Sequence, residues 1–111
     1  VVQRFNIPQG YNDFESMLDN AELDFVDICT RPYSHVPLTK MAAQRGLPVL
    51  CQKPFCEGIE EAKELVEFCD NAGVRLMVNE NWRWQAWHRK ARELLDSGAL
   101  GMFIFFGGFF R

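Results

Sequence analysis

Short apolar runs alternate along the chain with longer stretches in which apolar residues recur at helical spacing. The runs Phe25–Thr30, Val49–Cys51 and Val74–Val78 are rich in β-branched and other apolar residues, which favours three strands. Continuous apolar runs of this length are typical of parallel strands that are buried on both faces. A sheet of parallel strands is therefore the first expectation.

The segments between these runs have the periodicity of amphipathic helices. The clearest pattern covers residues 59–72 and ends at Gly73, with charged residues opposite one apolar face. The expected inward residues of that helix are Ile59, Ala62, Leu65, Val66 and Cys69. Weaker patterns predict the tail of a helix within residues 1–9, a short helix after the N-cap Asn12 or Asp13, a helix from the N-cap Ser34 to Gly46, and a helix from Trp87 to Ser97.

The alternation of strand and helix predicts an α/β fold with right-handed crossovers. A further apolar run, Met102–Phe106, predicts one more strand near the end of the sequence. No glycine-rich turn of the form G-x-G-x-x-G occurs in these residues. We expect the second half of a doubly wound parallel sheet over residues 1–100, and the first strand of a second α/β domain over residues 101–111.

Composition narrows the classes of protein and of partner. The hydrophobic fraction is 48% and the charged fraction 24%, as in globular proteins. Lys and Arg number 12 against 15 Asp and Glu, and the net charge of −3 argues against a general nucleic-acid binder. No apolar run reaches the roughly 20 residues that span a bilayer, so no membrane partner is expected. The 4 cysteines form no C-x-x-C pair, which indicates buried thiols in a reducing, cytoplasmic setting.

Polar side chains follow each predicted strand. They lie in Thr30–His35, Gln52–Pro54 and Asn79–Arg83, and they include a hydroxyl, an imidazole, amides, an ammonium and a guanidinium. Because parallel strands end at one edge of a sheet, these groups are expected to meet there. Such an edge suits a polar ligand that carries phosphates or hydroxyls.

Lys53 is the proton-transfer group that this edge offers. Burial would favour its neutral amine and make it a workable acid, while Pro54 restricts the backbone before it. Plainer interpretations exist for each residue: Lys53 as a surface lysine in a loop, His35 as a hydrogen bonder that orders a loop, and Arg83 as a cation stacked on nearby tryptophans. Tryptophans interleaved with arginine also occur in single-strand nucleic-acid binders, which the negative charge disfavours.

Three motifs in this order resemble the glucose–fructose oxidoreductase and inositol dehydrogenase family (Gfo/Idh/MocA). Leu23–Pro32 followed by His35 is similar to its strand motif with Thr-Pro and a following histidine. Gly46–Pro54 is similar to its Glu-Lys-Pro motif. Asn81–Gln85, followed by Leu94–Gly101, is similar to its arginine and the junction into the second domain.

The resemblance implies a partial Rossmann domain over residues 1–100 that binds NAD or NADP, and a C-terminal substrate domain that often forms a dimer interface. It implies hydride transfer between the nicotinamide and a sugar, polyol or related hydroxy compound, and a homo-oligomer in the full-length form. No metal is expected, because the residues show no metal-ligand spacing. Lys53 is the implied catalytic residue. The implied cofactor-contacting residues are Thr30, Pro32, His35, Gln52, Lys53 and Arg83.

The sequence departs from the family pattern at several places. Gln52 stands where glutamate is usual, which removes a carboxylate from the ribose edge. Arg31 stands where a small residue or proline is common, and Ala86 where a subgroup has proline. The glycine-rich phosphate loop and the catalytic histidine of the second domain are not among these residues.

Two rival hypotheses come from other classes of protein. In the first, the chain is a non-catalytic half-domain that docks on a partner through the strand Met102–Phe110, by β-augmentation. In the second, the chain is a thiol redox protein that uses Cys51 and Cys56, which requires a reactive thiolate.

Overall fold

The computed structural model describes residues 2–99 and 101, and describes only the backbone of Arg83. The strand expected at Met102–Phe106, and with it the proposed docking edge, lies outside the described residues. The chain separates between Asn79 and Glu80 into two compact units. Each unit is described here by itself, and the predicted domain boundary at residue 100 stays a prediction.

The first unit contains a parallel sheet of three strands in the order β1-β2-β3. The strands are β1, Val26–Ile28, β2, Val49–Gln52, and β3, Leu76–Asn79. This confirms the predicted parallel α/β architecture. The first and third strands are shorter than predicted. After β1 the Thr30 carbonyl faces a histidine ring rather than a neighbouring strand, and before β3 the Val74 N–H donates to the Cys69 carbonyl of the preceding helix.

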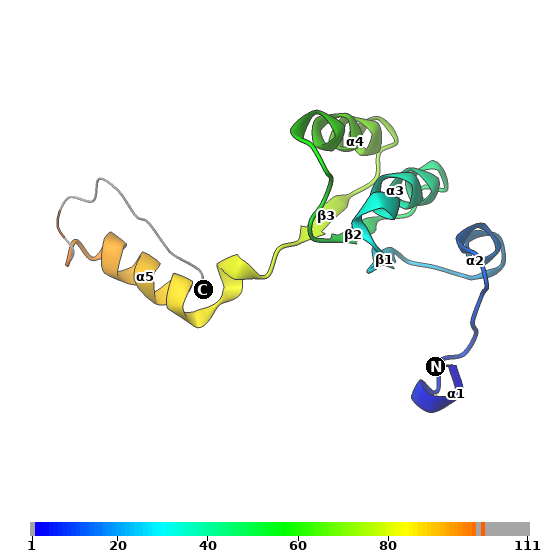
Figure 1. Cartoon of the computed structure of the whole chain (residues 1–111), viewed down its shortest axis with the longest axis horizontal. Helices are drawn as coiled ribbons and strands as arrows, with labels where there is room; N and C mark the ends of the chain where they lie inside the picture. Colours follow the sequence, from blue (N-terminus) through cyan, green and yellow to red (C-terminus); the bar gives the residue numbers. More distant parts are fainter. Residues whose placement is uncertain (1, 100, 102–111) are drawn as a thin grey trace. The chain divides into compact units, whose positions relative to one another are not determined.

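Two helices cover one face of this sheet (Figure 1). They are α3, His35–Gln44, and α4, Ile59–Asn71, and each connects two adjacent parallel strands. Apolar side chains from the strands and α3 form one buried cluster: Val26, Ile28, Ala42, Val49 and Cys51. A second cluster joins α3 to α4 and to Val74, just before β3. Its members are Ala43, Leu65, Cys69 and Val74. Each buried aliphatic side chain contributes about 1.5–3 kcal/mol of transfer free energy to this layer.

The predicted inward face of α4 is only partly correct. Leu65 and Cys69 are buried, but Ile59 is 68% exposed and Val66 is 45% exposed. The apolar stripe of the helix is wider than its line of contact, since within the described chain α4 packs against α3 and the adjoining edge of the core.

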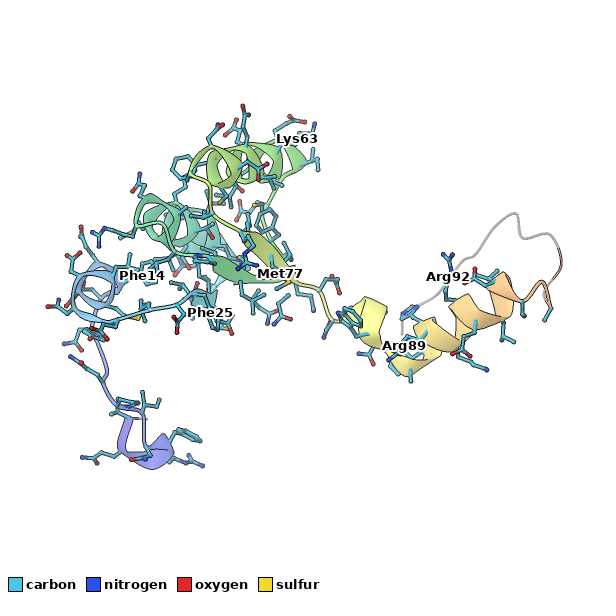
Figure 2. All side chains as sticks on the ribbon, turned by 180° about the vertical axis from the view of Figure 1, so that it is seen from behind. Phe14, Phe25, Lys63, Met77, Arg89 and Arg92 are labelled. Carbon is cyan, nitrogen blue, oxygen red and sulfur yellow. The ribbon has the colours of Figure 1, made fainter. Side chains whose placement is uncertain are left out.

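The second face of the sheet differs from the sequence-based expectation as well. Asp27, Leu50 and Met77 are register partners across the three strands. Met77 is 64% exposed, and Phe25, beside the start of β1, is also exposed (Figure 2). In the described residues β1 and β2 are therefore buried on one face, and β3 is at most partly buried, whereas burial on both faces was expected.

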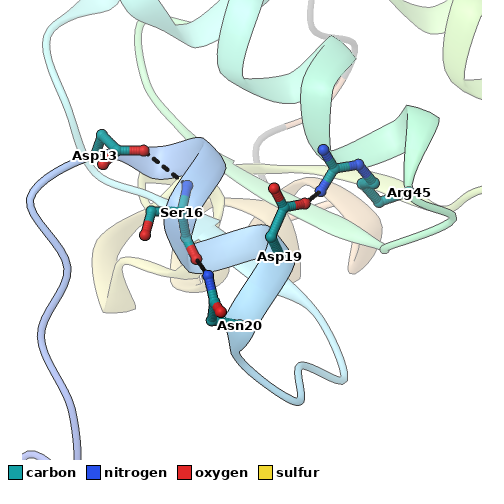
Figure 3. Close-up of polar contacts among 5 residues, drawn as sticks. All are labelled: Asp13, Ser16, Asp19, Asn20 and Arg45. Atoms are coloured by element: carbon teal, nitrogen blue, oxygen red, sulfur yellow. Dashed lines mark hydrogen bonds and ion pairs between the residues drawn. The ribbon is translucent and has the colours of Figure 1, made fainter.

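Two further helices precede the sheet, and the second begins at a predicted cap. The first, α1, covers Val2–Phe5, and α2 covers Phe14–Asn20. The Asp13 carboxylate caps α2 by accepting a hydrogen bond of 2.7 Å from the Ser16 backbone N–H, and Asp19 of α2 pairs with Arg45 (Figure 3). The cap satisfies one of the N–H groups left unpaired at a helix start.

The second unit holds a short 3₁₀ helix, η2, Trp82–Trp84, followed by α5, Ala86–Asp96. None of the α5 side chains that are described is fully buried. In residues 2–99, no helix combines the length and apolar character needed to cross a membrane.

Candidate functional site

The turn after β1 forms one part of the predicted polar edge. Residues Pro32–Ser34 form a 3₁₀ helix, η1. Ser34 does not cap α3 with its side chain; its hydroxyl donates to the Arg31 carbonyl at 2.8 Å. The Thr30 hydroxyl lies 2.7 Å from the same Ser34 oxygen and therefore acts as the donor in that contact. Its own oxygen remains able to accept a hydrogen bond.

His35, the first residue of α3, lies between two loops. Its side chain is 0% exposed. Its Nδ1 is 2.9 Å from the Pro54 carbonyl oxygen, and its Nε2 is 3.1 Å from the Thr30 carbonyl oxygen. The imidazole thus connects the turn after β1 to the turn after β2. The interpretation of His35 as a residue that orders a loop is confirmed, while its contact with a ribose stays a prediction.

The turn after β2 presents Lys53 to solvent. Gln52 is half-buried at the end of β2, and its side-chain oxygen accepts a hydrogen bond of 2.9 Å from the Lys53 backbone N–H. The Lys53–Pro54 peptide bond is cis. Lys53 and Pro54 are exposed, so the burial of Lys53 considered from the sequence is not observed in the described residues. Its catalytic role stays a prediction.

The third strand brings another amide to the same edge. Asn79, the last residue of β3, is the register partner of Gln52. The parallel sheet therefore brings together the strand ends that carry Thr30, Gln52 and Asn79, as predicted. Arg83 belongs to the second unit and its side chain is not described, so its place beside these groups stays a prediction.

The thiols have the properties of unreactive groups. A hydrogen bond to the Asp27 carboxylate, at 3.3 Å, raises the pKa of exposed Cys29, with some desolvation. Burial raises the pKa of Cys51 to about 11, and burial also raises the pKa values of Cys56 and Cys69. All four thiols are therefore protonated at neutral pH, which argues against the redox hypothesis.

The described residues offer no set of metal ligands. Within the described part of the chain, no three His, Cys, Asp or Glu side chains come together as metal ligands would. The chemical groups at the edge include instead the Lys53 ammonium, two amides, the hydroxyls of Thr30 and Ser34 and the backbone of two turns. They are suited to binding hydroxyls and to moving a proton.

The sequence pattern of one known family matches residues 1–80, and that family is described as the oxidoreductase family with an NAD-binding Rossmann fold (GFO_IDH_MocA). The chain belongs to this family. The match covers both turns of the polar edge and all of the sheet. The resemblance drawn from the three motifs is thereby confirmed, together with the Rossmann-like fold.

Individual Gfo/Idh/MocA relatives are similar over most of the chain. D-apiose dehydrogenase of Rhizobium rhizogenes is 42% identical over 91% of this chain. D-xylose 1-dehydrogenase (NADP(+)) 2 of Haloferax volcanii is 34% identical over 87% of it. The crystal structure of an oxidoreductase from Agrobacterium radiobacter in complex with NAD+, L-tartaric acid and magnesium superimposes with a TM-score of 0.84, at 40% identity over 91% of this chain.

This chain spans less than a third of each of these proteins. The shares are 29% of the apiose dehydrogenase, 30% of the xylose dehydrogenase and 30% of the structurally similar oxidoreductase. The residues that match the family pattern are those that carry the polar edge.

Sequence reasoning missed the two backbone carbonyls that flank His35 and the carboxylate that binds Cys29. The contacts of His35 depend on how two separate turns meet in space. A histidine at the first turn of a helix, after a strand end, was the available signal for the first contact. The second had a local signal, because Asp27 and Cys29 are two residues apart and so point to the same side of a strand.

Proposed function

We propose that the full-length protein is an NAD- or NADP-dependent dehydrogenase that acts on a sugar, polyol or related hydroxy compound. The observation that carries this proposal is the exposed Lys53 at the carboxyl edge of the sheet, within a chain of this family. Two relatives that share at least a third of their matched residues are named as dehydrogenases of D-apiose and D-xylose. Both are aldoses, which favours an aldose as the substrate.

The residues at the edge fit the nicotinamide–ribose end of such a cofactor. Thr30 offers a hydroxyl that already donates to Ser34 and retains an acceptor, and Gln52 and Asn79 offer amides. These groups are the partners that ribose hydroxyls and a carboxamide require. The sequence printed above contains no G-x-G-x-x-G turn. The described residues are therefore suited to bind the nicotinamide–ribose end of the cofactor and not its diphosphate.

In the proposed reaction, Lys53 is the group that accepts or donates the proton of the substrate hydroxyl. When bound, the nicotinamide supplies the hydride acceptor or donor. As a neutral amine, Lys53 takes the proton of the hydroxyl that is oxidised, and as an ammonium it returns a proton in the reverse direction. Its positive form also stabilises negative charge on that oxygen. Because the side chain is exposed, the proton exchanges with water after each turnover.

We further propose that the protein is cytoplasmic, forms a homo-oligomer and uses neither a membrane nor a nucleic acid as its partner. The four free thiols suit a reducing compartment, and the net charge of −3 disfavours binding to polyanions. Cell fractionation and sedimentation of the full-length protein test these statements. Recovery in the membrane fraction, or a monomer at all concentrations, would contradict them.

The experiment for the main proposal uses the full-length protein with NAD+ or NADP+. A panel of aldoses, including D-apiose and D-xylose, is compared with linear and cyclic polyols, and cofactor reduction is followed by absorbance. We expect reduction with at least one aldose and a preference for one of the two cofactors. The proposal is wrong if no compound supports reduction and calorimetry detects no binding of either cofactor.

A further inference from the structure

We propose that His35 is a positioning residue that fixes Lys53 by holding the Pro54 carbonyl against the end of β1. The inference rests on the proposed function, because it assigns His35 a part in the work of Lys53. It differs from the direct cofactor contact that the family resemblance implies for His35. The fully buried ring, with both nitrogens facing backbone carbonyls, is the observation behind it.

The position of the ring in the sheet supports this role. The ladder between β1 and β2 ends with the pair Ile28 and Cys51. Past that pair each strand leads into its own turn. The imidazole joins the Thr30 carbonyl of one turn to the Pro54 carbonyl of the other. The ring therefore adds one more link between the two strands beyond the last ladder pair. His35 and Pro54, which it joins, are 19 residues apart in the sequence.

The turn that carries Lys53 has few other attachments. The Lys53 backbone N–H is bonded to its own neighbour Gln52, and Pro54 has no N–H to donate. Among the hydrogen bonds of the described residues, the contact from His35 is the one that ties Lys53–Pro54 to another element. A change at His35 is thus transmitted to the backbone that carries the ammonium.

The two contacts of the ring are not chemically equivalent. A neutral imidazole has one N–H donor and one acceptor nitrogen, whereas both carbonyl oxygens only accept. A neutral ring therefore donates to one carbonyl and not to the other. In the proposed arrangement the N–H is on Nδ1, whose contact with the Pro54 oxygen is 2.9 Å, against 3.1 Å between Nε2 and the Thr30 oxygen. The strong bond is then the one to the turn that carries Lys53.

Two amide substitutions separate the two contacts. The side-chain nitrogen of His35→Asn lies near the place of Nδ1, and that of His35→Gln near the place of Nε2. In the full-length enzyme we expect His35→Asn to keep kcat within about threefold and His35→Gln to lower kcat by about ten- to a hundredfold, as a misplacement of about 1 Å does. The KM for the cofactor is expected to stay unchanged in both variants.

Hydrogen exchange gives a readout that does not depend on activity. We expect faster exchange of the Phe55–Glu57 amides in His35→Gln than in His35→Asn, with α3 and α4 unchanged in both. If the wild-type protein is inactive, the proposed function fails while this comparison still tests the connection between the loops. In wild-type protein, ¹⁵N NMR of His35 should show a protonated Nδ1, which tests the geometry even if the variants do not fold.

Three results would overturn the inference. The first is a ring protonated at Nε2 alone. The second is equal kcat and equal exchange at Phe55–Glu57 in the two variants. The third is an equal rise in the KM for the cofactor with kcat preserved, which would mean that His35 binds the cofactor directly.

Discussion

The side-chain oxygen of Gln52 accepts a hydrogen bond from the backbone N–H of Lys53 at 2.9 Å. A glutamate at this position keeps the acceptor, whereas leucine removes it. We therefore expect Gln52→Glu to keep turnover of the full-length protein within about threefold. Gln52→Leu is expected to cost about 1 kcal/mol of stability, the usual net value of one such bond. Denaturant unfolding and steady-state kinetics check both expectations, and equal stability of the two variants would show that the bond contributes nothing.

Replacement of Lys53 tests its role in proton transfer. We expect Lys53→Ala to lower kcat of the full-length protein by roughly two to four orders of magnitude, the range for loss of a general acid–base group. Lys63→Ala is the matched control, because Lys63 is an exposed lysine of α4 whose pairing with Glu60 is solvent-exposed. Near-normal kcat in Lys53→Ala would remove Lys53 from the mechanism.

Gly46 and Gly58 differ in backbone conformation but not in surrounding space. A Cβ at either position meets nothing within 4 Å, yet Gly46 has a φ of +72° while Gly58 has a φ of −142°. Gly46→Ala is expected to lower the free energy of unfolding by about 1–2 kcal/mol, the penalty for left-handed backbone in an L-residue. Gly58→Ser places a favourable N-cap residue before α4 and is expected to cost nothing. Unfolding midpoints compare the two, and an equal loss in both would contradict the argument from φ.

Stability at alkaline pH is expected to reflect Cys51. Burial raises the pKa of this thiol from 9.0 to about 11, so the folded protein keeps the proton after the unfolded chain has lost it. The contribution to stability is therefore complete below about pH 9 and is lost as the pH rises towards about 11. Unfolding measured across this range should show a steeper decline in the wild type than in Cys51→Ala. Parallel curves for the two proteins would exclude a contribution from this thiol.

The sequence predicts best those features that depend on a few adjacent residues. The cap of α2 at Asp13 and the end of α3 at Gly46 follow from side-chain and backbone chemistry within one helical turn. The parallel sheet was predictable too, because the order of apolar runs and helical segments leaves few topologies.

Features that depend on packing between elements were predicted less well. The periodicity of α4 placed Ile59 and Val66 inside, but periodicity states that a face is apolar and not what lies against it. The same reason explains Met77, which is apolar and yet exposed on β3. At the candidate site, parallel topology predicted that Gln52 and Asn79 meet, while the enclosure of His35 by two carbonyls required the positions of both turns.

The sheet order β1-β2-β3 has a consequence for how the first unit assembles. Within the described residues, each strand pairs with the next strand in the sequence. The register partners Val26 and Val49 are 23 residues apart, and Val49 and Leu76 are 27 apart, so each pairing waits for the helix that connects the two strands. During synthesis, the β1–β2 pair with α3 can form before α4 and β3 have left the ribosome. The turn that carries Lys53 is then built on a template that is already in place.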